Sequence, residues 1–273
     1  MIQPGKFTLT IEVVPPESID SRPLMTALSD LAHLPFDGFS VATNPLAKPC
    51  MSAQVICTLI RRQIGKPAIL HVTPRDHNRL GIFSLLSGAK ALGIDTVMAA
   101  TGDFVALKDR AHTRGVYDMT VFELVAQARE IGLKTGVVLD PNPGSPGFET
   151  AVKRLERKVA AGAQFIVTQP VYDMDGVMQL AEVTQHLGVP LLMGILPLRT
   201  PRHAEFLHHR VAGITVPRSV RDRMARAGDP VAEGAAQARD MLAAARDTFA
   251  GACIMPPFNH YEVMAAIIGS GDA

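Results

Sequence analysis

A local pattern recurs along the chain: a stretch of helical periodicity, then a glycine, then a short apolar strand. It occurs at residues 91–101, 130–140, 161–169, 186–196 and 250–257. Each glycine is placed to close a helix in the left-handed conformation. Continuously apolar strands are typical of a parallel sheet covered on both faces. The pattern therefore predicts repeated β–α units with right-handed crossovers.

The starts of the expected helices agree with this interpretation. Thr120 and Glu123 have the spacing of a capping box. Thr200–Pro201 and Asp229–Pro230 each place a capping residue before a proline that suits the first helical turn. We therefore expect helices to begin at these three places.

Counting the apolar segments gives about eight strands, a number and spacing that favour a closed (β/α)8 barrel. An open doubly wound sheet is the alternative, but its glycine fingerprint is missing after the first strand. Two helical stretches within residues 211–249 are expected to elaborate the final units. No linker interrupts the chain, so we expect a single domain over residues 1–273. The strands are expected near residues 7–12, 37–42, 67–72, 95–101, 134–139, 164–169, 190–196 and 251–255.

Composition narrows the class of protein. Of 273 residues, 47% are apolar and 19% are charged, which fits a soluble protein with an ample core. The net charge of +1 gives no reason to expect a nucleic-acid partner, and no apolar stretch is long enough to span a membrane. Three cysteines without CxxC spacing favour a reducing, cytoplasmic compartment. No set of metal ligands stands out, and a homo-oligomer is compatible with the sequence.

A single carboxylate, Glu12, interrupts the first apolar segment just before Pro15 and Pro16. A carboxylate is costly to bury unless it is paired or its pKa rises so that it holds a proton. Glu12 could therefore be a proton donor, or it could simply cap a loop at the end of a strand. Its position alone does not separate the two interpretations.

Polar residues follow nearly every expected strand, and in a barrel the catalytic residues collect at these strand ends. This gathering of polar groups at one mouth indicates an enzyme. Glu12 and Asp103 suit a division of labour between one protonated and one ionised carboxyl group, although Asp103 could also be a turn residue. The polar positions are Glu12, Thr43–Asn44, His71–Asp76, Thr101–Asp103, Asp140–Asn142 and Thr168–Gln169.

Arg154 and Lys158 lie four residues apart and so share one face of an expected helix. The simpler interpretation of this face is a solvated basic stripe, which the spacing alone favours. The alternative is a contact to a cofactor phosphate or ribose from beside the barrel mouth.

At this point the sequence resembles the methylenetetrahydrofolate reductase family along nearly its whole length. It is most similar to the short bacterial form that also occurs fused to a homocysteine methyltransferase domain. The resemblance implies a (β/α)8 barrel that holds FAD, oxidises NADH or NADPH, and reduces 5,10-methylenetetrahydrofolate to 5-methyltetrahydrofolate. The matching stretches are IEVVPPES, HVTPRDHNRLG, AATGD, GVYD, LERKVAAGAQFIVTQPVYD, MGILPLRTPRHAEFL, GITVP and IMPPF.

The resemblance also implies roles for individual residues. Glu12 matches the general acid, and Asp103 matches an aspartate beside the flavin and the pterin. Gln169 matches a residue that contacts folate and nicotinamide, and Lys158 matches a cofactor-binding lysine. The remaining cofactor contacts would come from Thr43, Asn44, His71, Thr101, Gly102, Tyr117, Asp118 and Asp140.

Several positions depart from the best-known bacterial branch. Thr101 stands where that branch has an arginine, and Asp140 stands near its tyrosine. His203 replaces a folate-contacting glutamine, and His260 replaces an arginine suited to the glutamate tail, so both are expected to contact folate. Two other hypotheses remain open: direct hydride transfer from nicotinamide to folate without flavin, and a non-catalytic folate-binding subunit of a larger complex.

Overall fold

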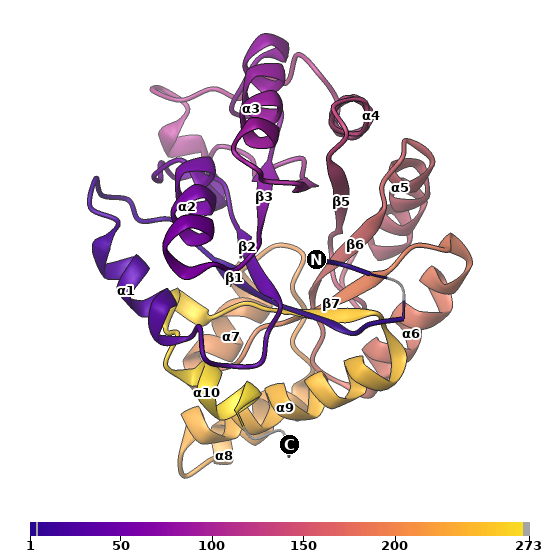
Figure 1. The fold of residues 1–273 in the computed structure, drawn as a ribbon. Coiled ribbons are helices and arrows are strands. Elements are labelled where there is room, and N and C mark those ends of the chain that lie inside the picture. The colour runs from indigo at the N-terminus through magenta and orange to yellow at the C-terminus, as the bar shows by residue number, and fades with distance from the viewer. Residues whose placement is uncertain (4, 270–273) are drawn as a thin grey trace.

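The computed structural model describes residues 1–3 and 5–269, and in this part of the chain eight parallel strands form a closed barrel (Figure 1). The strands follow one another around the ring in chain order, and β1 pairs with both β2 and β8. The predicted (β/α)8 barrel is therefore confirmed. The strands are β1 (Thr8–Val13), β2 (Gly38–Val41), β3 (Ala68–Val72), β4 (Thr96–Ala99), β5 (Lys134–Leu139), β6 (Phe165–Pro170), β7 (Leu191–Ile195) and β8 (Gly251–Ile254).

Helices surround the ring of strands in Figure 1. Two of them, α8 and α9, follow α7 between the last two strands and confirm the extra helices expected within residues 211–249. No helix in the described ranges combines the length and the apolar character needed to cross a membrane. The helices are α1 (Arg22–Asp30), α2 (Ala53–Leu59), α3 (Arg79–Ala91), α4 (Val121–Glu130), α5 (Phe148–Ala160), α6 (Met174–Thr184), α7 (Pro201–Arg210), α8 (Arg218–Arg226), α9 (Pro230–Thr248) and α10 (Val263–Ile268). Short helical turns are η1 (Pro45–Ala47), η2 (Ile60–Ile64), η3 (Leu107–Asp109), η4 (Gln185–Leu187) and η5 (Pro257–Asn259).

The helix boundaries follow the predicted signals with one exception. Thr120 and Glu123 form the capping box at the start of α4, and Thr200 and Asp229 cap α7 and α9. The prediction for Gly251 was wrong, because this residue lies inside β8 rather than closing a helix. A side chain there would collide with the Thr8 carbonyl, so glycine allows β1 and β8 to approach closely. The other four glycines of the predicted pattern, Gly93, Gly132, Gly162 and Gly188, do close helices with positive φ.

Apolar side chains fill the inside of the barrel away from its mouth. Ile69, Phe165 and Leu192 belong to this inner cluster, together with Ile2 from the N-terminal segment. The N-terminus lies near the centre of the ring in Figure 1, and the Lys134 ammonium donates a hydrogen bond to the Ile2 carbonyl. The interior is therefore packed at this end, and the open end of the barrel is where the strands finish.

Candidate active site

Glu12 lies near the end of β1 with its side chain directed into the barrel. Leu9, Ile11 and Val13 pack outward against the helices, so the alternation of a strand turns Glu12 inward. The side chain keeps a partly exposed edge, and within the described residues no hydrogen bond to its carboxyl group is found. Burial and, to a smaller extent, the charge of Asp103 raise the pKa of Glu12 to about 7. The carboxyl group is thus set to exchange a proton near neutral pH.

The neighbouring strands place polar side chains beside Glu12. Ser40 of β2 is the registered partner of Glu12, and its Oγ lies 2.7 Å from Nε2 of His71 on β3. Burial lowers the pKa of His71 to about 3, so its imidazole is neutral at physiological pH. Burial raises the pKa of the Cys253 thiol to about 12, and the nearby Glu12 carboxylate acts in the same direction. Next to Glu12, these groups therefore stay uncharged.

The loop after β4 brings Asp103 to the mouth. Asp103 is exposed, and its Oδ2 accepts a hydrogen bond from the Leu46 amide at 2.6 Å. Gly102 has a φ of +82°, and a Cβ there would lie 2.5 Å from the Thr73 hydroxyl. The same hydroxyl donates to the Thr101 carbonyl at 2.8 Å. The Thr-Gly-Asp turn therefore needs its glycine both for conformation and for close approach.

The loop after β2 carries Thr43 and Asn44, two of the predicted cofactor contacts. Thr43 is half-buried, and Asn44 has a φ of 41°. The Asn44 side chain donates to Asp76 at 3.1 Å and accepts from the Cys50 amide at 3.0 Å. Asn44 therefore joins the loops after β2 and β3 at the mouth.

Tyr117 and Asp118 approach from the segment before α4. The Tyr117 amide donates to the Pro74 carbonyl at 3.0 Å, which holds its backbone beside the loop after β3. The Asp118 carboxylate accepts from the Arg79 amide at 2.9 Å and so occupies the start of α3. Tyr117 keeps an exposed ring at this side of the mouth, whereas the carboxylate of Asp118 already has a structural partner.

Asp140, Gln169 and Lys158 gather beside the ends of β5 and β6. Asp140 keeps an exposed side, partial desolvation raises its pKa, and the neighbouring Gln169 side chain opposes that shift. Lys158 lies buried on α5 and donates to the Val138 carbonyl at 2.7 Å. Burial, aided by the charge of Arg154, lowers the pKa of Lys158 to about 8. Lys158 therefore does not belong to a solvated stripe; its ammonium lies inside the protein next to the mouth.

His203 and His260 lie at the other side of the ring, after β7 and β8. His203 is buried on α7, its ring centroid is 5.1 Å from that of Phe258, and burial lowers its pKa to about 4. His260 Nδ1 lies 2.6 Å from the Glu262 carboxylate. Since β8 neighbours β1 while β4 and β5 lie across the barrel, the two histidines approach the mouth from the side opposite Asp103 and Asp140.

Sequence reasoning assigned no role to Arg75 or Asp76, although both follow β3 directly. They form an ion pair between a buried arginine and a half-buried aspartate, with Arg75 Nε 2.6 Å from Asp76 Oδ1. The adjacent opposite charges of Arg75 and Asp76 at the end of a strand are the sequence signal that could have indicated this pair. Ser40 was also missed, because a serine within an apolar strand has no spacing that marks it.

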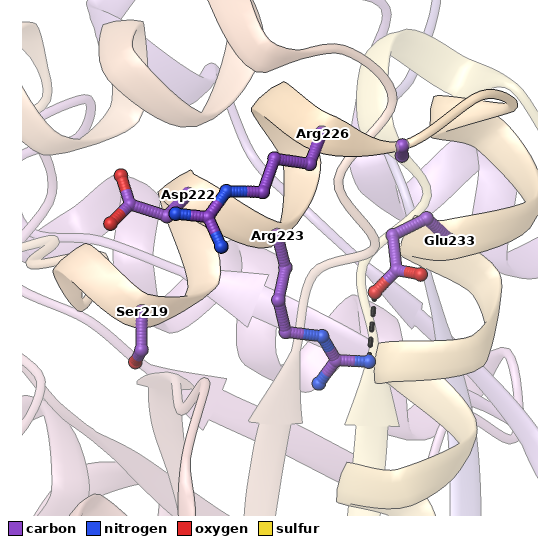
Figure 2. A pocket seen from close by; sticks show the side chains of 6 residues that line it. Ser219, Asp222, Arg223, Arg226 and Glu233 are labelled. Atoms are coloured by element: carbon purple, nitrogen blue, oxygen red, sulfur yellow. Dashed lines mark ion pairs between the residues drawn. The ribbon is translucent and has the colours of Figure 1, made fainter.

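Two hollows differ in their relation to these residues. One of about 270 Å³ lies at the mouth between the loops after β2, β3 and β4 and is lined by Asn44, Lys48, Arg75 and Arg114, among others. The other, of about 450 Å³, is an open depression formed by α8 and α9, where Arg223 lies 2.8 Å from Glu233 (Figure 2). None of the predicted site residues lines this second hollow, so the candidate site is at the barrel mouth.

Comparison with known proteins identifies related sequences. The chain is 22% identical to a probable methylenetetrahydrofolate reductase (NADPH) of Caenorhabditis elegans over 49% of its length, and spans 21% of that protein. It is 22% identical to 5,10-methylenetetrahydrofolate reductase of Pectobacterium carotovorum and 19% identical to that of Buchnera aphidicola, over 71% of its length in each case. The chain covers 65% and 66% of these two bacterial proteins.

Solved structures share the fold. An uncharacterized protein from Clostridium thermocellum, described as binding two copies of 5-methyl-5,6,7,8-tetrahydrofolic acid, matches with a TM-score of 0.69 and 14% identity, over 96% of this chain and 93% of that one. A 2,3-dimethylmalate lyase matches with a TM-score of 0.54 and 14% identity, over 96% of this chain and 80% of that one. At such low identity these likenesses show the barrel fold alone.

The profile of one protein family, methylenetetrahydrofolate reductase, matches residues 1–245. This match covers β1 to β7, and with them Glu12, Asp103, Lys158 and Gln169. The chain therefore belongs to the methylenetetrahydrofolate reductase family.

Proposed function

We propose that this protein reduces 5,10-methylenetetrahydrofolate to 5-methyltetrahydrofolate, with NADH or NADPH as the reductant and FAD as the bound cofactor. The observation that carries the proposal is Glu12, an inward-facing carboxyl group with a pKa of about 7 at the mouth of a barrel of this family. The names of the curated relatives and the folate bound by the Clostridium thermocellum protein support the choice of substrate.

Glu12 acts as the general acid. Its protonated form gives a proton to a nitrogen of the five-membered ring that bridges the folate substrate, the bond from that nitrogen to the bridging carbon breaks, and the resulting iminium carbon accepts a hydride. A general acid works best when its pKa is near the operating pH. Because the pKa of Glu12 is about 7, folate reduction should decline as pH rises above neutrality and the proton is lost.

Residues at the mouth fit a flavin nucleotide. Tyr117 offers an exposed ring, and Lys158 and Arg154 offer cations beside the opening. When bound, FAD would take a hydride from the reduced nicotinamide and supply it to folate. The residues that would hold it are Thr43, Asn44, His71, Thr101, Gly102, Asp103, Tyr117, Asp118, Asp140 and Lys158.

The remaining residues orient the substrate. Gln169 lies beside Asp140, where its amide can hydrogen-bond a pterin or a nicotinamide carboxamide in turn. His203 and His260 approach from the other side of the mouth and can contact the rest of the folate. Since His203 is neutral at physiological pH, it would contribute hydrogen bonding and packing rather than charge.

The test is an anaerobic absorbance experiment on the purified protein. A flavin band that NADH or NADPH bleaches, and that methylenetetrahydrofolate then restores, is the expected result. Glu12→Gln should leave the bleaching unchanged and slow the folate step by about 100-fold or more. Glu17→Gln, which alters an exposed glutamate in the same segment, is the control.

Other outcomes select the alternatives. If the protein is colourless and still reduces folate, the flavin mechanism is wrong and the hydride passes directly from nicotinamide to folate. If the protein binds folate but does not reduce it with NADH or NADPH in the presence of added FAD, the protein is a non-catalytic folate-binding subunit. Loss of both half-reactions in Glu12→Gln would make Glu12 a structural residue and remove the main support for the proposed mechanism.

A further inference from the structure

The guanidinium of Arg75 lies between the loops that follow β2, β3 and β4. Arg75 is only 3% exposed. Its Nε and Nη2 donate to the Asp76 carboxylate at 2.6 and 2.9 Å, and Nη2 also donates to the Asn44 carbonyl at 2.9 Å. Nη1 donates to the Asp103 carbonyl at 3.2 Å. One buried side chain therefore joins three successive loops of the mouth.

The loop after β2 needs to be held in place by its surroundings. Asn44, Leu46 and Ala47 have φ values of 41°, 55° and 55°. Asparagine adopts such left-handed conformations readily, whereas leucine and alanine keep them only where surrounding contacts enforce them. Here the contacts are those of Arg75 and Asp76 with Asn44, and the hydrogen bond from the Leu46 amide to Asp103. Removing the Arg75 guanidinium should therefore let the loop after β2 relax.

Arginine suits this position better than any other residue. A buried ion pair contributes little net stability compared with apolar packing, and its best-attested use is to select one geometry. The planar guanidinium directs its donors along fixed lines, so it can bind a carboxylate and two carbonyls at once. A lysine at position 75 would keep the charge but could not reproduce this fork.

We propose that Arg75 is a positioning residue of the active site, which holds the loops after β2 and β4 so that Asn44 and Asp103 face the barrel mouth together. This inference concerns the same site as the proposed function and rests on that function only for the pH profile described below. In this role Arg75 acts through Asn44 and Asp103, the two residues whose carbonyl groups it holds. Because the charge of Asp103 contributes to the high pKa of Glu12, loosening these loops also affects the proton donor.

The first test measures amide hydrogen exchange in ligand-free protein, so its result does not depend on which reaction the protein catalyses. Arg75→Lys should speed exchange by about tenfold or more in residues 43–49 and 101–109 and leave the strands unchanged. The control is Arg22→Lys, which alters an exposed arginine that also binds an aspartate in bidentate fashion, with both distances 2.8 Å. Asp76→Asn is the second variant and should loosen the same two segments to a smaller degree.

The second test measures the pH profile of kcat/KM for folate reduction. Arg75→Lys keeps the positive charge, so a displaced Asp103 should lower the pKa of Glu12 and move the alkaline limb by about 0.5 pH unit toward acid. Arg22→Lys should leave the limb in place. Unchanged exchange in the two loops, or faster exchange spread evenly over the barrel, would overturn the proposal, because Arg75 would then be dispensable or a support of the whole fold. An unmoved alkaline limb together with loosened loops would overturn the link to Asp103.

Discussion

Replacing Glu12 by glutamine should stabilise the folded protein, and by an amount that depends on pH. The pKa of Glu12 is raised from 4.5 to about 7 on folding. At 1.36 kcal/mol for each pH unit, the difference corresponds to about 3 kcal/mol. Because the side chain keeps an exposed edge, we take this figure as an upper value.

The sign follows from which state releases its proton first. Below pH 4.5 both the folded and the unfolded chain carry the proton, so Glu12 and a glutamine differ little. Between pH 4.5 and 7 the unfolded chain loses the proton while the folded protein retains it, and the native protein is progressively destabilised. Above pH 7 the folded protein carries a buried carboxylate, and Glu12→Gln should be more stable by up to about 3 kcal/mol.

The assay is thermal unfolding followed by circular dichroism at pH 5, 6, 7 and 8.5. At about 2 °C for each kcal/mol, the advantage of Glu12→Gln should grow to about 6 °C at pH 8.5 and be small at pH 5. Glu17→Gln controls for the loss of one negative charge. A Glu12→Gln difference that is the same at pH 5 and pH 8.5 would refute the reasoning, because Glu12 would then titrate alike in both states.

Three further predictions concern packing. Gly102→Ala should lower the free energy of unfolding, measured by urea titration, by clearly more than Gly132→Ala does. Both glycines have positive φ, but only a side chain at position 102 would also meet the Thr73 hydroxyl. Equal losses would mean that backbone strain alone determines the cost. Gly136→Ala should destabilise the barrel by several kcal/mol through a clash with the Phe165 ring, and Phe165→Leu should recover part of the loss, which a double-mutant cycle would measure. Of the three thiols, Cys50 alone is not buried and should react with a thiol reagent in the native protein, with the other two reacting only after unfolding.

Much of the barrel could be predicted because its signals are local. A glycine after a helical stretch, or a capping threonine before one, acts through its own backbone neighbours, so Gly132 and Thr120 were interpreted correctly. Gly251 was misinterpreted because its role is to let β1 approach, and that contact joins residues at opposite ends of the barrel sequence. Local patterns carry no information about such a partner.

The mouth was less predictable than the ring. The inward direction of Glu12 follows from strand alternation, but the left-handed conformations of Leu46 and Phe258 could not be foreseen, because neither residue prefers them. At Leu46 the conformation comes with tertiary contacts, among them the amide that binds Asp103. The role of Arg75 was hidden for the same reason, since its three partners lie on three different loops.

The pairing of β1 with β8 links the chemistry of Glu12 to the folding of the barrel. The strand that carries Glu12 is made near the start of the chain, yet its neighbour β8 begins only at Gly251. Contacts so distant in sequence are costly in chain entropy to close, so we expect this pairing to form late in folding. A carboxyl group with a pKa of about 7 can therefore exist only once the ring has closed. At pH 6, the uptake of a proton by Glu12 during refolding should therefore report when β1 and β8 pair.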